Sequence, residues 1–370
     1  MQACRQAKPI PNSSFDFYGV LFMRTRLSAL LVVILAFSTI CICLAQPART
    51  RLVVSASGRG DFRTVQGAVD HAMGPTVIAI QPGIYHEKVS ISRKGIWLIG
   101  LGANPEDVTI TFGDSAKNTG STFKSGTVIV DADQFAAENL SIVNTWWDDH
   151  ADPADASQAV ALQLSSDQSV LDRVRLLSGQ DTLYAASRTC RGSTNSGSCD
   201  ASREYFNDCF IEGNVDYIFG DAKAVFNHCE LHSRRHHEIM ITAQSKHFPA
   251  EESGYYFLNC KITGVNEWDQ VMLGRPWRDY ATVLFDHTDI EQTLAPEGWS
   301  EWGGRLKTAT YREYDSYGPG VNGGKRIVKS PPLTREEKRQ LNPRSLLEGA
   351  DGWNPISEAK QLQRLVHRLR

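Results

Sequence analysis

The 370-residue sequence lacks a strong excess of charge, and it lacks low-complexity segments. Its 39 basic and 42 acidic side chains leave a formal net charge of −3 at neutral pH. Residues 1–45 alone contribute +3, so the remainder of the chain carries a net charge near −6. A surface that binds nucleic acid is normally rich in positive charge. We therefore expect no nucleic acid partner, and an acidic ligand would have to meet local cations or bind in a neutral form.

Spacings typical of metal sites are also missing. The eight cysteines include no Cys-x-x-Cys pair and no cysteine–histidine pattern of the kind that binds zinc. Histidines gather at 232–237, where the pattern is compatible with a metal cluster or with a solvated loop end, and we favour the loop. We expect no metal and no cofactor.

The N-terminus has the features of a leader. Arg24 and Arg26 precede the apolar run 27–37, and the small residue Ala45 ends the segment. This order is typical of a secretory signal peptide. We expect residues 1–45 to be an upstream extension and secretory signal, with Met23 as an alternative start, and cleavage near Ala45 to leave a secreted protein, extracellular or periplasmic. A retained membrane anchor is the alternative.

Export permits disulfides, and five cysteines follow residue 45. Because five is an odd number, at least one thiol stays free or bonds to another molecule. Cys190 and Cys199 flank the polar stretch 191–198, and we expect a disulfide that closes this loop.

Helical periodicity is scarce in the rest of the chain. It is visible only at 62–73 and near the C-terminus at 357–370. From residue 53 onward, short apolar runs alternate with polar or glycine-containing turns, which is typical of β-strands. A sandwich and a solenoid both have this pattern, so repeats decide between them.

One seven-residue phrase recurs along the chain. Its copies are "AAENLSI" (136–142), "VLDRVRL" (170–176), "YFNDCFI" (205–211), "VFNHCEL" (225–231), "YFLNCKI" (256–262) and "LFDHTDI" (284–290). Their spacings of 34, 35, 20, 31 and 28 residues fit coils of a parallel β-helix with loops inserted. We therefore predict an all-β, single-domain parallel β-helix over 46–370, with a short N-terminal helix and a C-terminal helical tail that packs on the solenoid.

Stacked coils place equivalent residues in columns, and neighbouring residues within a column lie about 4.8 Å apart. The fifth position of the phrase puts Cys209, Cys229 and Cys260 in one inward column. A bridge between Cys229 and Cys260, with Cys209 free, is plausible, although sequence does not decide the pairing. Asp181 and Asp216 each follow the fifth position of their own copy by seven residues. On neighbouring coils they would lie roughly 5 Å apart, unless their shared position is a coincidence of two turns.

Two close carboxylates favour acid–base chemistry, because one pKa rises and the other falls. Arg275 in "LGRPW" could pair with one aspartate and keep it anionic, which would leave the other protonated as a general acid. Gln158 and Gln180 could donate hydrogen bonds to a developing oxyanion. Taken alone, either glutamine could equally be a polar residue on a β-helix ladder.

Several motifs then resemble the pectin methylesterase family in order: "GIYHEK" (83–88), "QAVAL" (158–162), "GQDTLY" (179–184), "VDYIFG" (215–220) and "LGRPW" (273–277). "GRGDFRTVQGAV" (58–69) is similar to the opening stretch of the family, and the likeness covers about 52–302. The resemblance implies a right-handed parallel β-helix that hydrolyses methyl esters of homogalacturonan (pectin). We expect a monomer, with no membrane partner after the signal is removed.

The resemblance also implies roles for single residues. It makes Asp216 the nucleophile, Asp181 the acid and later the base, and Arg275 the partner of the nucleophile. Gln158 and Gln180 correspond to the oxyanion amides. Contacts with sugar rings are implied for Thr122, Tyr184, Arg275 and Trp277, although Trp277 alone could be a core residue.

Some features depart from the plant members of the family. Residues 46–51 leave no room for an inhibitor-like pro-region, and the Cys190–Cys199 loop resembles bacterial members. Val174 stands where plant members often have cysteine. The alternatives that the sequence leaves open are a β-helix glycosidase or lyase, an esterase on a substrate other than pectin, and a non-catalytic wall-binding protein.

Overall fold

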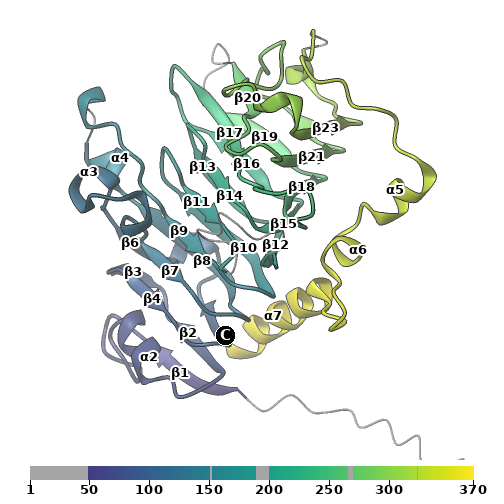
Figure 1. Cartoon of the computed structure of the whole chain (residues 1–370). Helices are drawn as coiled ribbons and strands as arrows, with labels where there is room; N and C mark the ends of the chain where they lie inside the picture. The colour runs from purple at the N-terminus through teal and green to yellow at the C-terminus, as the bar shows by residue number, and fades with distance from the viewer. Residues whose placement is uncertain (1–48, 151, 189–199, 266–269, 323) are drawn as a thin grey trace, which may run out of the picture. The chain divides into compact units, whose positions relative to one another are not determined.

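The structure is a computed structural model that describes residues 49–150, 152–188, 200–265, 270–322 and 324–370. Short strands follow one another around a coil, and every pairing between the described strands is parallel (Figure 1). A strand pairs with the equivalent strand of the next coil, for example β12 with β15 and β15 with β18. The chain is therefore a parallel β-helix, as the repeat predicts.

The longest face of the solenoid is one ladder of ten strands. They are β1 (Thr50–Val54), β2 (Thr76–Ile80), β5 (Ile96–Gly100), β8 (Ala136–Asn144), β10 (Ser169–Leu177), β12 (Arg203–Asn207), β15 (Lys223–Asn227), β18 (Gly254–Leu258), β21 (Thr282–Asp286) and β23 (Thr310–Tyr314).

A second group of strands adjoins this ladder. It comprises β3 (Gly83–His86), β6 (Val108–Phe112), β13 (Phe210–Gly213), β16 (Glu230–Ser233), β19 (Lys261–Gly264) and β22 (Asp289–Ile290). β8 and β10 are long enough to belong to both faces, since their second halves pair with β6 and β13.

The third face is a separate sheet of seven strands, and it carries the candidate site. Its members are β4 (Val89–Ile91), β7 (Val128–Val130), β9 (Leu162–Leu164), β11 (Leu183–Ala185), β14 (Ile218–Gly220), β17 (Ile239–Gln244) and β20 (Val271–Gly274).

The bend between the first two faces explains the polar residue in the middle of the repeated phrase. The fourth position has left-handed backbone in all six copies, with φ between 49° and 57°. Asn, Asp and His tolerate this conformation better than other non-glycine residues, and five of the six copies use one of them: Asn139, Asp208, His228, Asn259 and His287. The phrase is therefore a turn signal as well as a packing signal.

Inward positions stack in columns, as expected. Leu140 lies beside Val174, and the register of the following strands extends this column to the three cysteines. A second column stacks the rings of Phe206, Phe226, Phe257 and Phe285, with centroids 4.3 to 4.6 Å apart. These columns fill the centre of the solenoid with apolar contacts.

The suggested bridge between Cys229 and Cys260 is wrong, because Cys209, Cys229 and Cys260 are all free, buried thiols. Each sulfur lies near a backbone carbonyl of the preceding coil: Cys229 Sγ is 3.5 Å from the Phe206 oxygen, and Cys260 Sγ is 3.3 Å from the Phe226 oxygen. The thiols therefore point at backbone acceptors. The predicted Cys190–Cys199 disulfide lies outside the described residues.

The predicted N-terminal helix is α2 (Val65–His71). The Thr64 side chain accepts a hydrogen bond from the Gly67 amide at its start. The carboxylate of Glu87, in the motif "GIYHEK", accepts hydrogen bonds from the first two helical amides at 2.8 and 2.9 Å. A carboxylate suits this position because the N-terminus of a helix carries partial positive charge.

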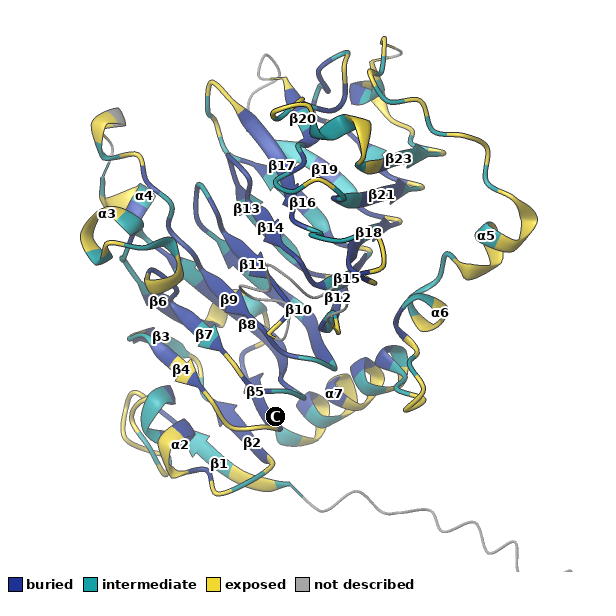
Figure 2. Ribbon diagram, in the orientation of Figure 1, coloured by how far each residue is buried: buried dark blue, intermediate teal, exposed yellow. Residues whose placement is uncertain are grey.

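The C-terminal helices are α5 (Arg335–Gln340), α6 (Pro343–Leu347) and α7 (Pro355–Leu369). Leu347 of α6 and Leu362 of α7 pack on outward side chains of the ten-strand ladder, among them Trp97 and Val170. Figure 2 shows α7 with buried residues toward the strands and exposed residues on its other side. The tail thus covers an apolar sheet face, as predicted.

The remaining short elements lie in loops. They are α3 (Ala116–Thr119), α4 (Trp146–Asp149), and the 3-10 turns η1 (Pro105–Asp107), η2 (Thr122–Lys124), η3 (Pro153–Asp155), η4 (Arg305–Lys307) and η5 (Pro319–Val321). Within the part of the chain described here, no helix combines the length and apolarity needed to cross a membrane.

Candidate active site

A cleft of about 360 Å³ lies on the third face of the solenoid. Strands β9, β11, β14 and β20 bring its polar residues together, because those residues flank the strand ends. The lining comprises Thr122, Phe123, Gln158, Gln180, Asp181, Asp216, Phe219, Ala243, Arg275, Trp277 and Trp302. All five residues predicted for the chemistry lie in this set.

Asp181 and Asp216 occupy equivalent places on neighbouring coils. Leu183 pairs with Ile218 in the parallel ladder of β11 and β14, and each aspartate stands two residues before its member of this pair. The Asp181 amide donates to the Val215 carbonyl at 3.0 Å, which joins the two turns. Both aspartates have left-handed backbone, with φ of 63° and 50°. The shared offset in the sequence therefore reflects a shared position in the fold.

Arg275 forms a two-pronged ion pair with Asp216. Its Nε donates to Asp216 Oδ1 at 2.9 Å, and one terminal nitrogen donates to Oδ2 at 2.7 Å. The other terminal nitrogen donates to Glu238 at 2.8 Å. The ring of Trp302 lies under the guanidinium, 4.5 Å from its central carbon. All three nitrogens of the guanidinium thus donate hydrogen bonds and one of its faces packs on a ring, so Arg275 holds Asp216 in one orientation.

Burial governs the charge of both aspartates. The Asp181 side chain is deeply buried, and this burial raises the pKa of its carboxyl well above the usual range, with the Asp216 charge adding to the rise. Burial also raises the pKa of Asp216, but the hydrogen bonds and charge of Arg275 oppose that rise. Asp216 is therefore the acid that ionises more readily, and Asp181 is the one that keeps its proton.

The two glutamines present their amides at the same cleft. The Ala159 amide donates to the Gln180 carbonyl at 3.0 Å, so the main chains beside Gln158 and Gln180 are linked. Among the described residues, neither side-chain amide makes a hydrogen bond, and both side chains are half-buried. Each amide therefore has donors available for a bound group.

The residues predicted to contact sugar rings differ in where they lie. Trp277 and Thr122 line the cleft. Tyr184 does not line it: its side chain is 6% exposed and packs beneath Phe123 and Phe219, with ring centroids 5.1 and 4.8 Å away. The structure therefore makes Tyr184 a support for the cleft wall, because the alternation along β11 directs it outward under a layer of other rings.

Sequence reasoning missed four residues around the cleft. Phe123 directly follows Thr122, and Phe219 stands inside the motif "VDYIFG", so the sequence could have pointed to both. Trp302 lies at the end of the motif-bearing region. Glu238 follows the histidine-rich run in a stretch without any motif, and only the structure brings it to Arg275.

Comparisons with known proteins identify the family of the chain. Residues 51–348 match the model of the family described as Pectinesterase. The chain belongs to the pectinesterase family. It is 33% identical over 308 residues to Pectinesterase 31 of Arabidopsis thaliana, which covers 78% of this chain and 90% of that protein. Members of this family are carboxylic ester hydrolases.

Solved structures show the same likeness. The pectin methylesterase from carrot superposes with a TM-score of 0.68 at 29% identity, covering 84% of this chain and 95% of that one. A pectin methylesterase in complex with a hexasaccharide superposes with a TM-score of 0.66 at 25% identity, covering 83% and 99%. The closer likeness to bacterial members rests largely on the loop at 190–199, outside the described residues, and stays a prediction.

Proposed function

We propose that this pectinesterase hydrolyses the methyl esters of homogalacturonan, and that Asp216 and Asp181 carry the reaction. The single observation that carries the assignment is the pair of buried carboxylates on adjacent coils, only one of which is clamped by Arg275. This asymmetry gives one ionised and one protonated acid in the same cleft, as covalent ester hydrolysis requires.

The first half of the reaction forms an acyl-enzyme. An Asp216 carboxylate oxygen attacks the ester carbonyl carbon of a galacturonate, and the carbonyl oxygen becomes an oxyanion. The amides of Gln158 and Gln180 donate hydrogen bonds to that oxyanion. When the carbonyl reforms, the bond to the methoxy oxygen breaks, and Asp181 gives its proton to the departing methanol.

The second half returns the enzyme to its starting state. Asp181, now a carboxylate, takes a proton from water as the water oxygen attacks the same carbonyl carbon. The bond to Asp216 then breaks, which releases the free galacturonate carboxyl and restores the Asp216 carboxylate. Asp181 is again protonated, so acid and base alternate on one residue without any metal in the scheme.

The surrounding rings suit a polysaccharide. Phe123, Trp277 and Trp302 offer flat apolar surfaces beside the polar centre, which is the usual composition of a ligand cleft. We infer that Thr122, Arg275 and Trp277 contact the sugar chain, and that pectin is the substrate. We further infer that the protein acts as a secreted monomer.

Methanol release from highly methylated pectin tests the assignment. Wild type should release methanol, whereas Asp216→Asn, Asp216→Ala and Asp181→Ala should lose nearly all turnover while keeping a wild-type circular dichroism spectrum. Asp208→Asn is the matched control, because Asp208 is an exposed aspartate with the same left-handed backbone on the same coil as Asp216. Substantial methanol release by Asp216→Asn would remove Asp216 as the nucleophile.

Product analysis separates the rival reactions. A carboxylate pair about 5 Å apart also suits a retaining glycosidase, and a lyase would leave an unsaturated product. Chain shortening or unsaturated sugars without methanol would therefore replace the esterase assignment.

A further inference from the structure

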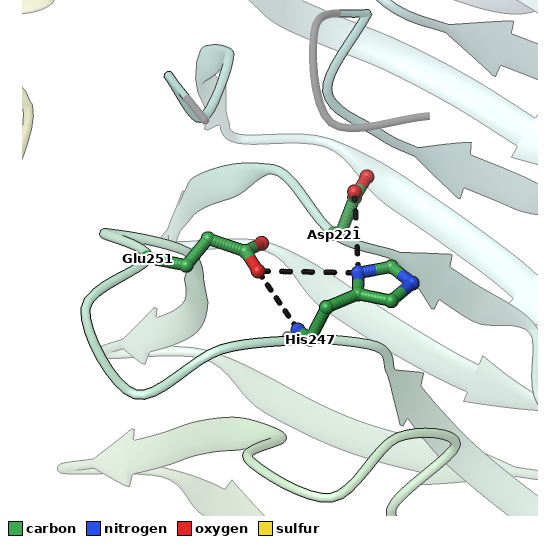
Figure 3. Close-up of side chains that lie close together, drawn as sticks. All are labelled: Asp221, His247 and Glu251. Carbon is green, nitrogen blue, oxygen red and sulfur yellow. Dashed lines mark hydrogen bonds and ion pairs between the residues drawn. The ribbon is translucent and has the colours of Figure 1, made fainter. Parts of the chain in front are cut away.

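Three ligand-type side chains meet at a second place on the molecule, and none of them lines the cleft. Asp221 directly follows β14, and His247 and Glu251 lie in the loop between β17 and β18. Figure 3 shows both carboxylates directed toward the imidazole ring. One oxygen from each acid and one ring nitrogen all lie within 4.8 Å of one another.

The distances suit a small cation. His247 Nδ1 is 4.0 Å from Asp221 Oδ2 and 3.9 Å from Glu251 Oε2 (Figure 3). Two ligands about 2.1 Å from a tetrahedral zinc ion lie about 3.4 Å apart. A contraction of roughly half an ångström would therefore bring His247 Nδ1 to zinc-ligand separation from each carboxylate oxygen, and the two carboxylate oxygens lie within 4.8 Å of each other.

Two of these side chains have unmet polar capacity. The Glu251 side chain is 0% exposed, and Oε1, the second oxygen of the carboxylate whose Oε2 faces His247, has no hydrogen-bond partner. His247 Nδ1 is likewise without a hydrogen-bond partner. Leaving a buried carboxylate oxygen unpaired is costly, and the only ion pair of Glu251 within the described part of the chain is the long one to His247.

Outer hydrogen bonds already hold both carboxylates in place. Asp221 Oδ1 accepts from the Ser187 amide at 2.7 Å, and Asp221 Oδ2 lies 4.0 Å from His247 Nδ1. Glu251 Oε2 accepts from the His247 amide at 2.8 Å. Such outer bonds are typical of metal sites, where they fix the ligands before the ion arrives.

We propose that Asp221, His247 and Glu251 form a binding site for one divalent zinc ion. An imidazole nitrogen with two carboxylates favours zinc over calcium, which prefers oxygen ligands alone. The His247 side chain is 28% exposed, so an ion can enter and a water molecule can fill the fourth position. The proposal differs from the expectation of no metal that was drawn from the sequence. His247 stands four residues before Glu251, and this spacing is too common in sequences to indicate a metal site by itself.

The bound ion would tie the cleft wall to the solenoid. The end of β17 and the loop that carries His247 both contact the segment after β20: the Trp277 amide donates to the Gln244 carbonyl at 3.1 Å, and the Tyr280 amide donates to the Lys246 carbonyl at 3.3 Å. Asp221 belongs to a different coil. Zinc would therefore cross-link the end of β14 to the loop that supports Trp277, which is a structural role separate from ester hydrolysis.

The experiment uses the full mature chain, freed of metal by a chelator and dialysed. Titration with zinc chloride, followed by calorimetry and by metal analysis after gel filtration, should give one zinc ion per wild-type chain and a higher Tm. Glu251→Gln and His247→Ala should lose this zinc ion and the Tm response. Calcium chloride should give neither effect.

His287→Ala is the matched control. His287 also lies within 4.8 Å of two carboxylates, Asp286 and Asp315, but that cluster is exposed on both His287 and Asp315. This variant should keep the wild-type stoichiometry. Equal zinc binding by wild type and Glu251→Gln, or no zinc-dependent Tm shift in wild type, would overturn the proposal. If His247→Ala fails to fold, an anomalous scattering peak between the three side chains in wild-type crystals, or its absence, decides the question independently of esterase activity.

Discussion

Replacing Arg275 by glutamine would test how the proposed nucleophile stays ionised. The change removes a positive charge and the two hydrogen bonds of 2.9 and 2.7 Å to Asp216, while the carboxylate remains only 7% exposed. Burial raises the pKa of Asp216, and Arg275 opposes this rise. Without the guanidinium, the pKa of Asp216 must therefore rise further.

The size of the effect follows from the pairing. An arginine beside an aspartate typically lowers its pKa by about 1–3 units. Since Asp216 must be ionised to attack, activity should rise with pH as Asp216 loses its proton. In Arg275→Gln this acidic limb should move upward by about 1–3 pH units. At a pH below both limbs, the loss of kcat/KM from ionisation alone would be about 10-fold to 1,000-fold.

The assay is a pH profile of kcat/KM for methanol release. Arg275→Lys keeps a charge but cannot form the two-pronged pair, so its limb should move less than that of Arg275→Gln. Arg312→Gln is the matched control, because Arg312 pairs with Glu337 at 3.1 Å and does not line the cleft. An equal loss of activity at every pH, with an unmoved limb, would refute the reasoning and assign Arg275 to substrate binding alone.

Three further predictions concern stability. Burial raises the pKa of Glu138 from 4.5 to about 10, and Asp172 adds to the rise. Between these two pH values the folded protein keeps the Glu138 proton, whereas the unfolded chain has lost it. Wild type should thus lose stability as pH rises between these values, by up to about 1.4 kcal/mol per unit, and urea unfolding of Glu138→Gln should show a flatter profile. Leu362→Ala should lower the free energy of unfolding by about 2–5 kcal/mol through loss of α7 packing, against no change for exposed Lys360→Ala. Gly220→Ala should lower Tm sharply, because φ is 120° and the added Cβ would lie 2.2 Å from the Ala185 oxygen; an unchanged Tm would contradict that geometry.

The sequence predicted the solenoid because its repeat encodes backbone conformation as well as burial. The left-handed turn at the fourth position of each phrase selects Asn, Asp or His in five of six copies, and the fifth position must be small enough to point inward. Both constraints act within seven residues and are therefore visible in the sequence. The offset that unites Asp181 and Asp216 follows from the same repeat, since the turn after it has one length on both coils.

Features that depend on contacts between distant segments could not be predicted. Whether stacked cysteines form a disulfide depends on the direction in which each sulfur points, and here the sulfurs point at backbone carbonyls of the preceding coil. Tyr184 is hidden because Phe123, from a loop about 60 residues earlier, covers it. Glu238 reaches Arg275 from another coil with no motif around it. Such contacts between distant segments leave no pattern in the local sequence, so only the folded structure shows them.

The proposed division of labour between Asp181 and Asp216 rests on how each one is surrounded. The parallel stacking gives both the same backbone conformation and similar burial, so nothing in the coil itself distinguishes them. The difference comes from Arg275, which directly follows β20 and donates hydrogen bonds to Asp216, the aspartate on the second of the two coils. Glu238 and Trp302 hold that guanidinium from its other sides. Glu238 itself also adds a negative charge that raises the pKa of Asp216. In Glu238→Gln this charge is gone while both hydrogen bonds from Arg275 to Asp216 can stay. The acidic limb of the kcat/KM profile should therefore move to lower pH, opposite to its movement in Arg275→Gln, and a limb that moves to higher pH would contradict this reasoning.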